Sequence, residues 1–506
     1  MSNRLLRARL LLPVMLLAFA VAPARSEERQ VEFRTDVIAA LSRAGCNQGA
    51  CHGSPQGKNG FRLSLRGFDP GLDLHTLTRG DMGRRVDVSN PENSLFLLKG
   101  TGRVPHQGGA LLKPDDPAYR MLRQWVAEGA RDSAASPLER LELTPERATL
   151  ASNAPKQQVT VKAHFKNGEA RDVTPLAVFS VNAAGCATVT AEGLVEFSKT
   201  GEASVLVRYL DQVRSARLTY VKSDPAFAFK SPVPANVIDR HVFAKQRELQ
   251  LLPAPLSSDE AFLRRVYLDA IGVLPTAEEA KAFLDSKDAD KRAKLIDRLL
   301  ERDEYASLWA LKWADVLRGS PTTISERGVH SFHRYLVRTM ADDRPMDEFV
   351  RELLTARGNT LHKPAANFFR IARTAEDAAE ACAQLFLGVR LQCAKCHNHP
   401  FESLTQTDFY GLAAYFSQVQ FKGTKFGLDD EIVFVQPNRE IQHPGTRKNQ
   451  APVAFGSAEA VMDKDADRRE RLAEWLTKSD NRYFAPAIAN RIWYHLFGKV
   501  HRRTRR

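Results

Sequence analysis

The spacing of apolar and polar residues divides the chain into three regions of different periodicity. Residues 32–132 open and close with apolar positions at helical spacing, around a middle that is rich in glycine. Residues 138–222 change to an alternating pattern, clearest at 159–165 and 203–209, which predicts short β-strands. Residues 236–420 return to helical spacing. A chain of 506 residues has room for about three domains, so we expect one domain in each region.

Start signals for helices are frequent in the third region. Ser257 with Glu260, and Thr276 with Glu279, have the spacing of capping boxes. The other segments lack a clear period. We therefore expect a linker at 223–235, an irregular connection at 421–464 and a further short module at 465–506.

Composition and charge exclude several classes of protein. Apolar residues make up 43% of the chain and charged residues 26%, as in folded globular proteins. Three arginines in residues 1–24 and five basic residues in residues 499–506 account for eight of the net charge of +13, which leaves +5 for the long body. The body has no basic stripe, so we expect no nucleic-acid partner.

Residues 1–24 have the pattern of a secretory signal peptide. Arg4, Arg7 and Arg9 precede an apolar run, and the run ends in Ala22-Pro23-Ala24. We therefore predict a periplasmic or secreted protein. The alternative is an uncleaved N-terminal anchor, which would be its only contact with the membrane.

Four of the six cysteines form two close pairs, and each pair is followed directly by a histidine. The second pair reads Cys393-Ala394-Lys395-Cys396-His397, the Cys-x-x-Cys-His signature of covalent haem attachment. In this motif the two thiols bond to the porphyrin edge, and the histidine becomes the proximal iron ligand. The first pair, Cys46 and Cys51 followed by His52, keeps the Cys-His end but has four intervening residues.

Both pairs are expected to follow a helix. The apolar spacing before residue 46 predicts a helix that leads into Cys46, and a second helix is predicted from residue 375 to residue 391, just before Cys393. The other two cysteines, Cys186 and Cys382, are expected to be unpaired thiols in the interior or at its edge.

Two alternatives to haem stay open at these pairs. Zinc is an alternative at the second site, where Cys393, Cys396, His397 and His399 supply four ligands of the right type within seven residues. A disulfide is the alternative at either pair, most simply between Cys46 and Cys51.

The motifs resemble those of planctomycete-type cytochrome c domain proteins over nearly the whole mature chain. The first Cys-His motif, the stretch 94–99, the stretch 104–109 and the stretch 125–130 are similar to the cytochrome c-like module of that family. Residues 264–269, 313–315 and 393–401 resemble its second, cytochrome-associated module of unknown function. The stretches 480–484 and 489–498 resemble the opening of a third module, so we expect a truncated gene product, or else a basic tail for an acidic partner.

The resemblance implies a multidomain fold. It consists of a small α-helical cytochrome c-like domain at 32–132, a β-sandwich Ig-like domain at 138–222, and a mainly α-helical C-terminal domain at 236–420. The run from Phe165 to Thr174 is similar to a bacterial Ig-like domain of group 2.

The sixth iron ligand of the first site is expected to be His106. It follows Pro105 and precedes Gly108-Gly109, where the backbone can approach a flat ligand closely, and the resemblance places a histidine there. The weaker candidates in this domain are Met82, Met121 and His75. In the helical domain, the further histidines considered for a metal are His330, His333, His362, His399 and His443.

The sequence thus predicts an extracytoplasmic c-type cytochrome-like protein with one or two haem c groups. Cys46, Cys51, Cys393 and Cys396 would attach the haem, and His52, His106 and His397 would ligate iron. Its partner would be an extracytoplasmic redox protein, with polysaccharide or cell-surface contact through the Ig-like domain. The alternatives are a periplasmic metal-dependent enzyme and a polysaccharide-associated surface protein, in which the clusters bind zinc or form disulfides; an electron-transfer protein is favoured over a hydrolase.

Overall fold

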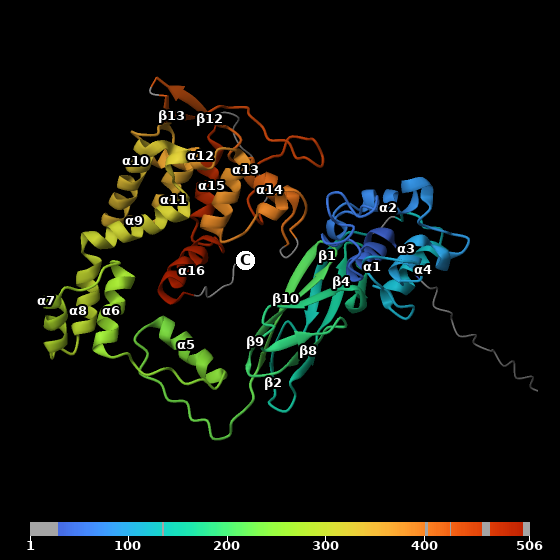
Figure 1. Cartoon of the computed structure of the whole chain (residues 1–506), viewed down its shortest axis with the longest axis horizontal. Helices are drawn as coiled ribbons and strands as arrows, with labels where there is room; N and C mark the ends of the chain where they lie inside the picture. Colours follow the sequence, from blue (N-terminus) through green and yellow to red (C-terminus); the bar gives the residue numbers. More distant parts are fainter. Residues whose placement is uncertain (1–28, 134–135, 400–402, 426, 458–465, 499–506) are drawn as a thin grey trace, which may run out of the picture.

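The computed structural model describes residues 29–133, 136–399, 403–425, 427–457 and 466–498. The predicted signal peptide at 1–24 and the basic tail at 499–506 lie outside the described residues. The described chain is multidomain: N-terminal helices are followed by sandwich-like β-sheets, and these by a helical part (Figure 1).

Short helices and long loops form the N-terminal part. A π-helical turn at Phe33–Val37 continues into α1 (Ile38–Arg43), and the closing helix is α4 (Pro117–Ala127), which buries Leu122, Trp125 and Val126 as the periodicity predicts. Between them lie five short elements that carry the loops, namely η2 (Leu65–Gly67), α2 (Pro70–Thr78), η3 (Gly80–Gly83), η4 (Pro91–Asn93) and α3 (Leu95–Gly100).

Ten short strands form three antiparallel or mixed sheets over residues 138–220. The strands are β1 (Leu138–Thr144), β2 (Arg147–Leu150), β3 (Lys156–Gln158), β4 (Thr160–Phe165), β5 (Ala170–Asp172), β6 (Val178–Val181), β7 (Ala187–Val189), β8 (Leu194–Phe197), β9 (Gly201–Tyr209) and β10 (Gln212–Tyr220). Their orders are β1-β4-β5, β2-β10-β9-β6 and β3-β8-β7. Alternation along β9 buries Ala203, Val205 and Val207, the pattern of a strand with one face in a core.

The N-terminal helices and the sheets share one hydrophobic core. This core runs without a break from Val31 to Tyr220 and includes Trp125 and Val161. Near the join, the Tyr209 hydroxyl donates to the Thr35 carbonyl oxygen at 3.5 Å. The two parts therefore form one packed unit, in which the sheet supports the loops of the N-terminal part.

The helical part begins after a long connection that has no helix or strand. Its helices are α5 (Val237–Glu248), α6 (Asp259–Ala270), α7 (Ala277–Asp285), α8 (Lys291–Leu300), α9 (Asp303–Leu317), α10 (Pro321–Ala341), α11 (Met346–Thr355), α12 (Asn367–Ile371), α13 (Ala375–Cys382), α14 (Gln406–Ala413), α15 (Arg468–Leu476) and α16 (Phe484–Phe497). Among the described residues, none of the helices has the length and apolar character needed to cross a membrane.

The two predicted capping boxes have different outcomes. Thr276 and Glu279 form theirs, with each side chain bonded to the other residue's backbone N–H. At α6 the cap is Ser258, whose hydroxyl accepts from Ala261 N, so the prediction for Ser257 was wrong by one residue. The choice between adjacent serines depends on which one has extended backbone before the helix.

Two further expectations for this part were wrong. The helix predicted over 375–391 ends at Leu387, because Gly388 takes a left-handed φ of 67° and closes it. The segment 421–464, expected to be irregular, contains most of a hairpin: β12 (Val419–Thr424) pairs with β13 (Gly427–Val435), and β11 (Gly358–Asn359) pairs with the other side of β13. The short continuous apolar run Ile432-Val433-Phe434-Val435, rich in β-branched residues, is the strand signal that was missed.

A buried ion network fastens the N-terminal helices to the sheets. Arg171, on β5, pairs with Glu32 at 3.0 Å and with Asp36 at 3.3 Å across the join, and with Glu169 at 2.6 Å on its own hairpin. Its guanidinium also lies 4.1 Å from the ring centroid of Phe165. Because Asp36 is buried, removal of Arg171 would leave this charge with Arg29, at 2.7 Å, as its remaining cationic partner.

We predict that Arg171→Met lowers the free energy of unfolding of this unit by about 3 kcal/mol, the usual scale for breaking a buried ion pair. Urea unfolding followed by tryptophan fluorescence measures the loss. The matched control is Arg140→Met, which removes an exposed arginine paired with Glu142 at 3.2 Å, and we expect at most about 0.5 kcal/mol there. Equal losses in the two variants would contradict the role given to Arg171.

A second buried carboxylate lies under the loops of the N-terminal part. Asp73, on α2, accepts hydrogen bonds from the Ser64 backbone N–H and from the Ser64 hydroxyl. Burial raises the pKa of Asp73 to about 6, because the bonds from Ser64 offset only part of the desolvation of the charge. Between the ordinary pKa of about 4 and the raised pKa of about 6, the Asp73 carboxyl is therefore protonated in the folded protein and ionised in the unfolded chain.

The raised pKa of Asp73 predicts that stability falls as pH rises from 4 to 6, since the folded state binds more protons in this window. A rise of about two pKa units corresponds to about 3 kcal/mol. We expect Asp73→Asn to remove this slope, measured as the difference in unfolding free energy between wild type and variant at pH 4 and pH 7. A difference that does not change with pH would show that Asp73 titrates normally.

Candidate functional site

The loop that carries the first cysteine pair is tied to the end of α1. Cys46 N–H donates to the Leu41 carbonyl oxygen at 3.0 Å, and His52 N–H donates to the Cys46 carbonyl oxygen at 3.1 Å. Asn47 is fully buried, and its amide donates to Ser42 Oγ at 2.9 Å. The helix therefore delivers Cys46 as the sequence predicts, and the four-residue spacer closes as a compact turn.

The His52 ring is oriented by a second, distant turn. Its Nδ1 lies 2.9 Å from the Phe61 carbonyl oxygen, and its ring centroid lies 4.4 Å from that of Phe61. A carbonyl oxygen only accepts, so Nδ1 carries the proton and Nε2 has the free lone pair. Burial lowers the pKa of His52, and the positive charges of His106 and Arg85 lower it further. The imidazole is thus neutral and suited to ligate a metal through Nε2.

His106 has the same arrangement on the other side of the site. Its Nδ1 lies 2.9 Å from the Gly109 carbonyl oxygen, which again leaves Nε2 as the free lone pair. The loop is attached to α3 by Lys99, whose ammonium group donates to the Pro105 carbonyl oxygen at 2.7 Å. A Cβ atom at Gly108 would lie 2.9 Å from His106 Cε1, so glycine is needed for the ring to lie where it does.

The two imidazoles face each other. Their ring centroids are 6.2 Å apart and their planes differ by 11°. A metal–nitrogen bond is about 2.0 Å and a ring centroid lies about 1 Å behind its nitrogen, so two ligands on opposite sides of one ion have centroids about 6 Å apart. The separation of the two rings and their two free Nε2 atoms fit residues that would together hold one metal ion.

The thiols beside this pair differ in environment from ordinary exposed cysteines. Cys46 and Cys51 are both half-buried. Burial raises the pKa of Cys46 to about 12, with a further contribution from the charge of a Cys51 thiolate. Cys46 therefore stays a protonated thiol at neutral pH, and the two cysteines are close enough to influence each other.

The weaker candidates for a ligand in this domain lie elsewhere. Met82 is 99% exposed, on a short turn, and His75 is exposed on α2. Met121 packs against the core on α4. The structure therefore brings His106 to His52, as the sequence predicts, and places none of these three as its substitute.

The second cysteine pair lies on a short 3₁₀ turn, Gln392–Lys395, after the helix that ends at Leu387. Cys393 and Cys396 are both exposed. His397 Nδ1 lies 2.8 Å from the Asn398 carbonyl oxygen, which leaves its Nε2 free in the same way as at the first site. The start of α14 fixes the turn, because the Gln406 side chain donates to the Lys395 carbonyl oxygen at 3.0 Å.

The histidines of the helical part do not gather around a common centre. His330 and His362 are exposed and His333 is half-buried. His443 is buried, and its Nδ1 accepts from Gly445 N–H at 3.1 Å, as a core histidine does. His399 is half-buried, and burial and the charge of His397 lower its pKa.

Within the described residues, no group of three or more His, Cys, Asp or Glu side chains is placed to hold a metal ion. No disulfide joins any two of the six cysteines in this structure, and Cys186 and Cys382 are half-buried and buried, as expected. Zinc at the second pair, and a disulfide at either pair, stay predictions from the sequence.

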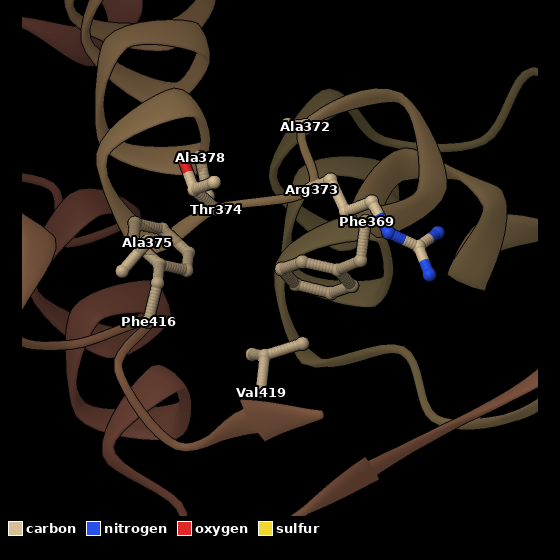
Figure 2. Close-up of a pocket in the computed structure, with 8 residues that line it drawn as sticks. All are labelled: Phe369, Ala372, Arg373, Thr374, Ala375, Ala378, Phe416 and Val419. Carbon is tan, nitrogen blue, oxygen red and sulfur yellow. The ribbon is translucent and has the colours of Figure 1, made fainter. Parts of the chain in front are cut away.

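A hollow in the helical part is too small to serve as a substrate site. It lies between α12 and α13, lined by Phe369, Arg373, Ala375, Phe416 and neighbouring residues (Figure 2). No space for a water molecule is left in it. Arg373 turns outward and pairs with Glu431 at 2.8 Å, so its charge is already compensated.

The residues that orient His52 were missed in the sequence. Arg85 is buried, lies 4.8 Å from the Phe61 ring centroid and donates to the Gly80 carbonyl oxygen at 2.8 Å. The signal for Phe61 was the Asn59-Gly60 pair, which makes a tight turn with positive φ at both residues. The linear sequence gives no signal for Arg85.

Comparison with known proteins bears on the helical part. No curated protein has a sequence that matches this chain. A family model described as PSCyt2, protein of unknown function (DUF1549), matches residues 237–421, the stretch that includes the second cysteine pair. The expected resemblance is therefore confirmed over these residues, and the chain carries a DUF1549 domain.

Proposed function

We propose that the protein is an extracytoplasmic c-type cytochrome-like protein that carries electrons through one or two covalently attached haem groups. The observation that carries the proposal is the facing pair His52 and His106 beside Cys46 and Cys51. A bound haem supplies an iron centre that accepts and donates one electron at a time.

The chain's own groups have distinct tasks at the first site. Cys46 and Cys51 would hold the porphyrin through thioether bonds, and the protonated state of Cys46 suits addition of a thiol to a vinyl group. His52 and His106 would ligate the iron through their free Nε2 atoms. The carbonyl groups of Phe61 and Gly109 hold the ring orientations and keep the proton on Nδ1. The ligand shell is thereby preorganised, and its rearrangement on electron transfer is small.

The second pair would also attach a haem, and His397 is the one described histidine placed beside it by the Cys-x-x-Cys-His spacing. Cys393 and Cys396 are exposed, and His397 has a free Nε2. No described histidine faces it as His106 faces His52. We propose haem c here as well, with an open or exchangeable second axial position, and zinc as the alternative at this site.

The other parts of the proposal concern domain identity and location. The N-terminal helical part would be a cytochrome c-like domain, and the sheets at 138–220 a bacterial Ig-like domain that acts as a spacer or contacts polysaccharide at the cell surface. The signal-peptide pattern at 1–24 supports a periplasmic or secreted location. The electron donor or acceptor would be an extracytoplasmic redox protein.

The competing function is a periplasmic metal-dependent enzyme, or a polysaccharide-associated surface protein without haem. It rests on the same Cys and His residues used as zinc ligands or as disulfides. A protein with covalent haem keeps its colour after denaturation, whereas both of these alternatives are colourless, so absorbance separates the classes directly.

We expect about two haem groups per chain in the pyridine haemochrome spectrum of protein exported by a host with cytochrome c maturation machinery. Cys46→Ala/Cys51→Ala should remove one, and Cys393→Ala/Cys396→Ala the other, because each pair holds its own porphyrin. Cys186→Ala is the matched control and should keep both.

The haem count of the wild type and of each double-cysteine variant decides which site, if either, attaches a haem. Loss of one haem with the first pair establishes the site at His52 and His106. A single haem that is lost only with the second pair would overturn the assignment of the first site. No covalent haem in the wild type would overturn the cytochrome proposal as a whole, and zinc analysis and disulfide mapping would then test the alternatives.

A further inference from the structure

A buried arginine lies behind the turn that holds the His52 ring. Only 5% of Arg85 is exposed, and its guanidinium lies 4.8 Å from the ring centroid of Phe61. The Phe61 ring centroid is in turn 4.4 Å from that of His52, and the Phe61 carbonyl oxygen lies 2.9 Å from His52 Nδ1. Arg85 is therefore connected to His52 through a single residue.

The guanidinium of Arg85 ties together the backbone around this turn. Its Nη2 donates to the Gly60 carbonyl oxygen at 3.3 Å, directly before Phe61. Its Nη1 donates to the carbonyl oxygens of Thr76, on α2, at 3.1 Å and of Gly80, on η3, at 2.8 Å. A Cβ atom at Gly80 would lie 3.0 Å from Nη1, so glycine leaves room for the guanidinium. One side chain thus fastens the turn to the end of α2.

The guanidinium also keeps a positive charge in the interior. Its carbonyl partners are neutral, and its carboxylate partner is Asp81, at 3.7 Å. The Asp81 side chain is 44% exposed and lies closer to Arg84, at 2.5 Å. Burial lowers the pKa of His52, and the charges of His106 and Arg85 lower it further, so the charge of Arg85 is felt at the imidazole. Solvent screens such a buried charge less than an exposed one.

We propose that Arg85 is the positioning residue of the first site, which locks the His52 ring through the Phe61 turn and raises the midpoint potential of the iron that His52 would ligate. This inference rests on the proposed haem at Cys46 and Cys51. Ferric iron carries one more positive charge than ferrous iron, so a nearby cation favours the ferrous form. The site then takes an electron from its redox partner more readily.

Redox titration of the full-length protein in a Cys393→Ala/Cys396→Ala background measures the potential of the first site alone. Arg85→Met keeps the apolar stem and removes the charge. It should lower the midpoint potential by about 59 mV, the value of a tenfold loss in the ratio of reduced to oxidised iron. Arg85→Lys keeps the charge and should lose less than half of this. Arg85→Gln, uncharged but still a donor, takes the place of Arg85→Met if that protein does not fold. Arg79→Met, an exposed arginine directly before Gly80, is the matched control and should leave the potential unchanged.

Haem-free protein tests the positioning of the ring without any iron. Full-length protein labelled with ¹⁵N-histidine, made in a host without the maturation machinery, shows by NMR which ring nitrogen holds the proton, at about pH 8.5, where an ordinary imidazole is neutral. In the wild type, His52 and His106 should both hold it on Nδ1, because each faces a carbonyl oxygen. In Arg85→Met and Arg85→Lys, which lack the planar fork, His52 should become a mixture of both tautomers. His106, held by Gly109, should stay on Nδ1 and is the internal control.

Two results would overturn the proposal. A midpoint potential in Arg85→Met equal to that of Arg79→Met would show that the buried charge does not act on the iron. A His52 ring that keeps its proton on Nδ1 in every Arg85 variant would show that the Phe61 turn holds without the guanidinium. A protein without covalent haem would overturn the proposed function and with it the effect on the potential, whereas the NMR result still decides whether Arg85 positions His52. The two failures are therefore distinguishable.

Discussion

The hydrogen bond between His52 Nδ1 and the Phe61 carbonyl oxygen is the contact on which the first site depends. It fixes the rotation of the ring, keeps the proton on Nδ1 and leaves the Nε2 lone pair free, with the His106 ring centroid 6.2 Å away. Gly109 does the same for the facing ring. Neither acceptor is a side chain, so the orientation is set by backbone turns that are packed on α1 and α3. The placement of the two rings is therefore a property of the folded domain.

Those turns are rigid because the N-terminal helices that carry them pack against the sheets. They share their core with the sheets, and the network around Arg171 ties Glu32 and Asp36 to β5. The same sheets receive the loop of the second motif through Val213 and Ser403. The sheets thus contact both the N-terminal helices and the loop that follows the second cysteine motif.

Much of this arrangement could be predicted from the sequence. The helices around Cys46 and Trp125, the strands and the facing of His52 by His106 follow from periodicity, glycine placement and family resemblance. The rest depends on contacts between distant residues. Gly388 ends the helix before Cys393 early, and the hairpin at 419–435 was hidden by the loop residues around it. Arg85 and Phe61 act through tertiary packing, which leaves no periodic signal in the chain.

We propose that His52 and His106 would both ligate the iron of one haem. Electron paramagnetic resonance of the ferric protein tests it most directly, in a Cys393→Ala/Cys396→Ala background that leaves only the first site. The account predicts a low-spin signal in the parent protein and a high-spin signal in His106→Gly, restored to low spin by added imidazole, while His75→Gly stays unchanged. A low-spin signal that survives in His106→Gly without imidazole would contradict the account.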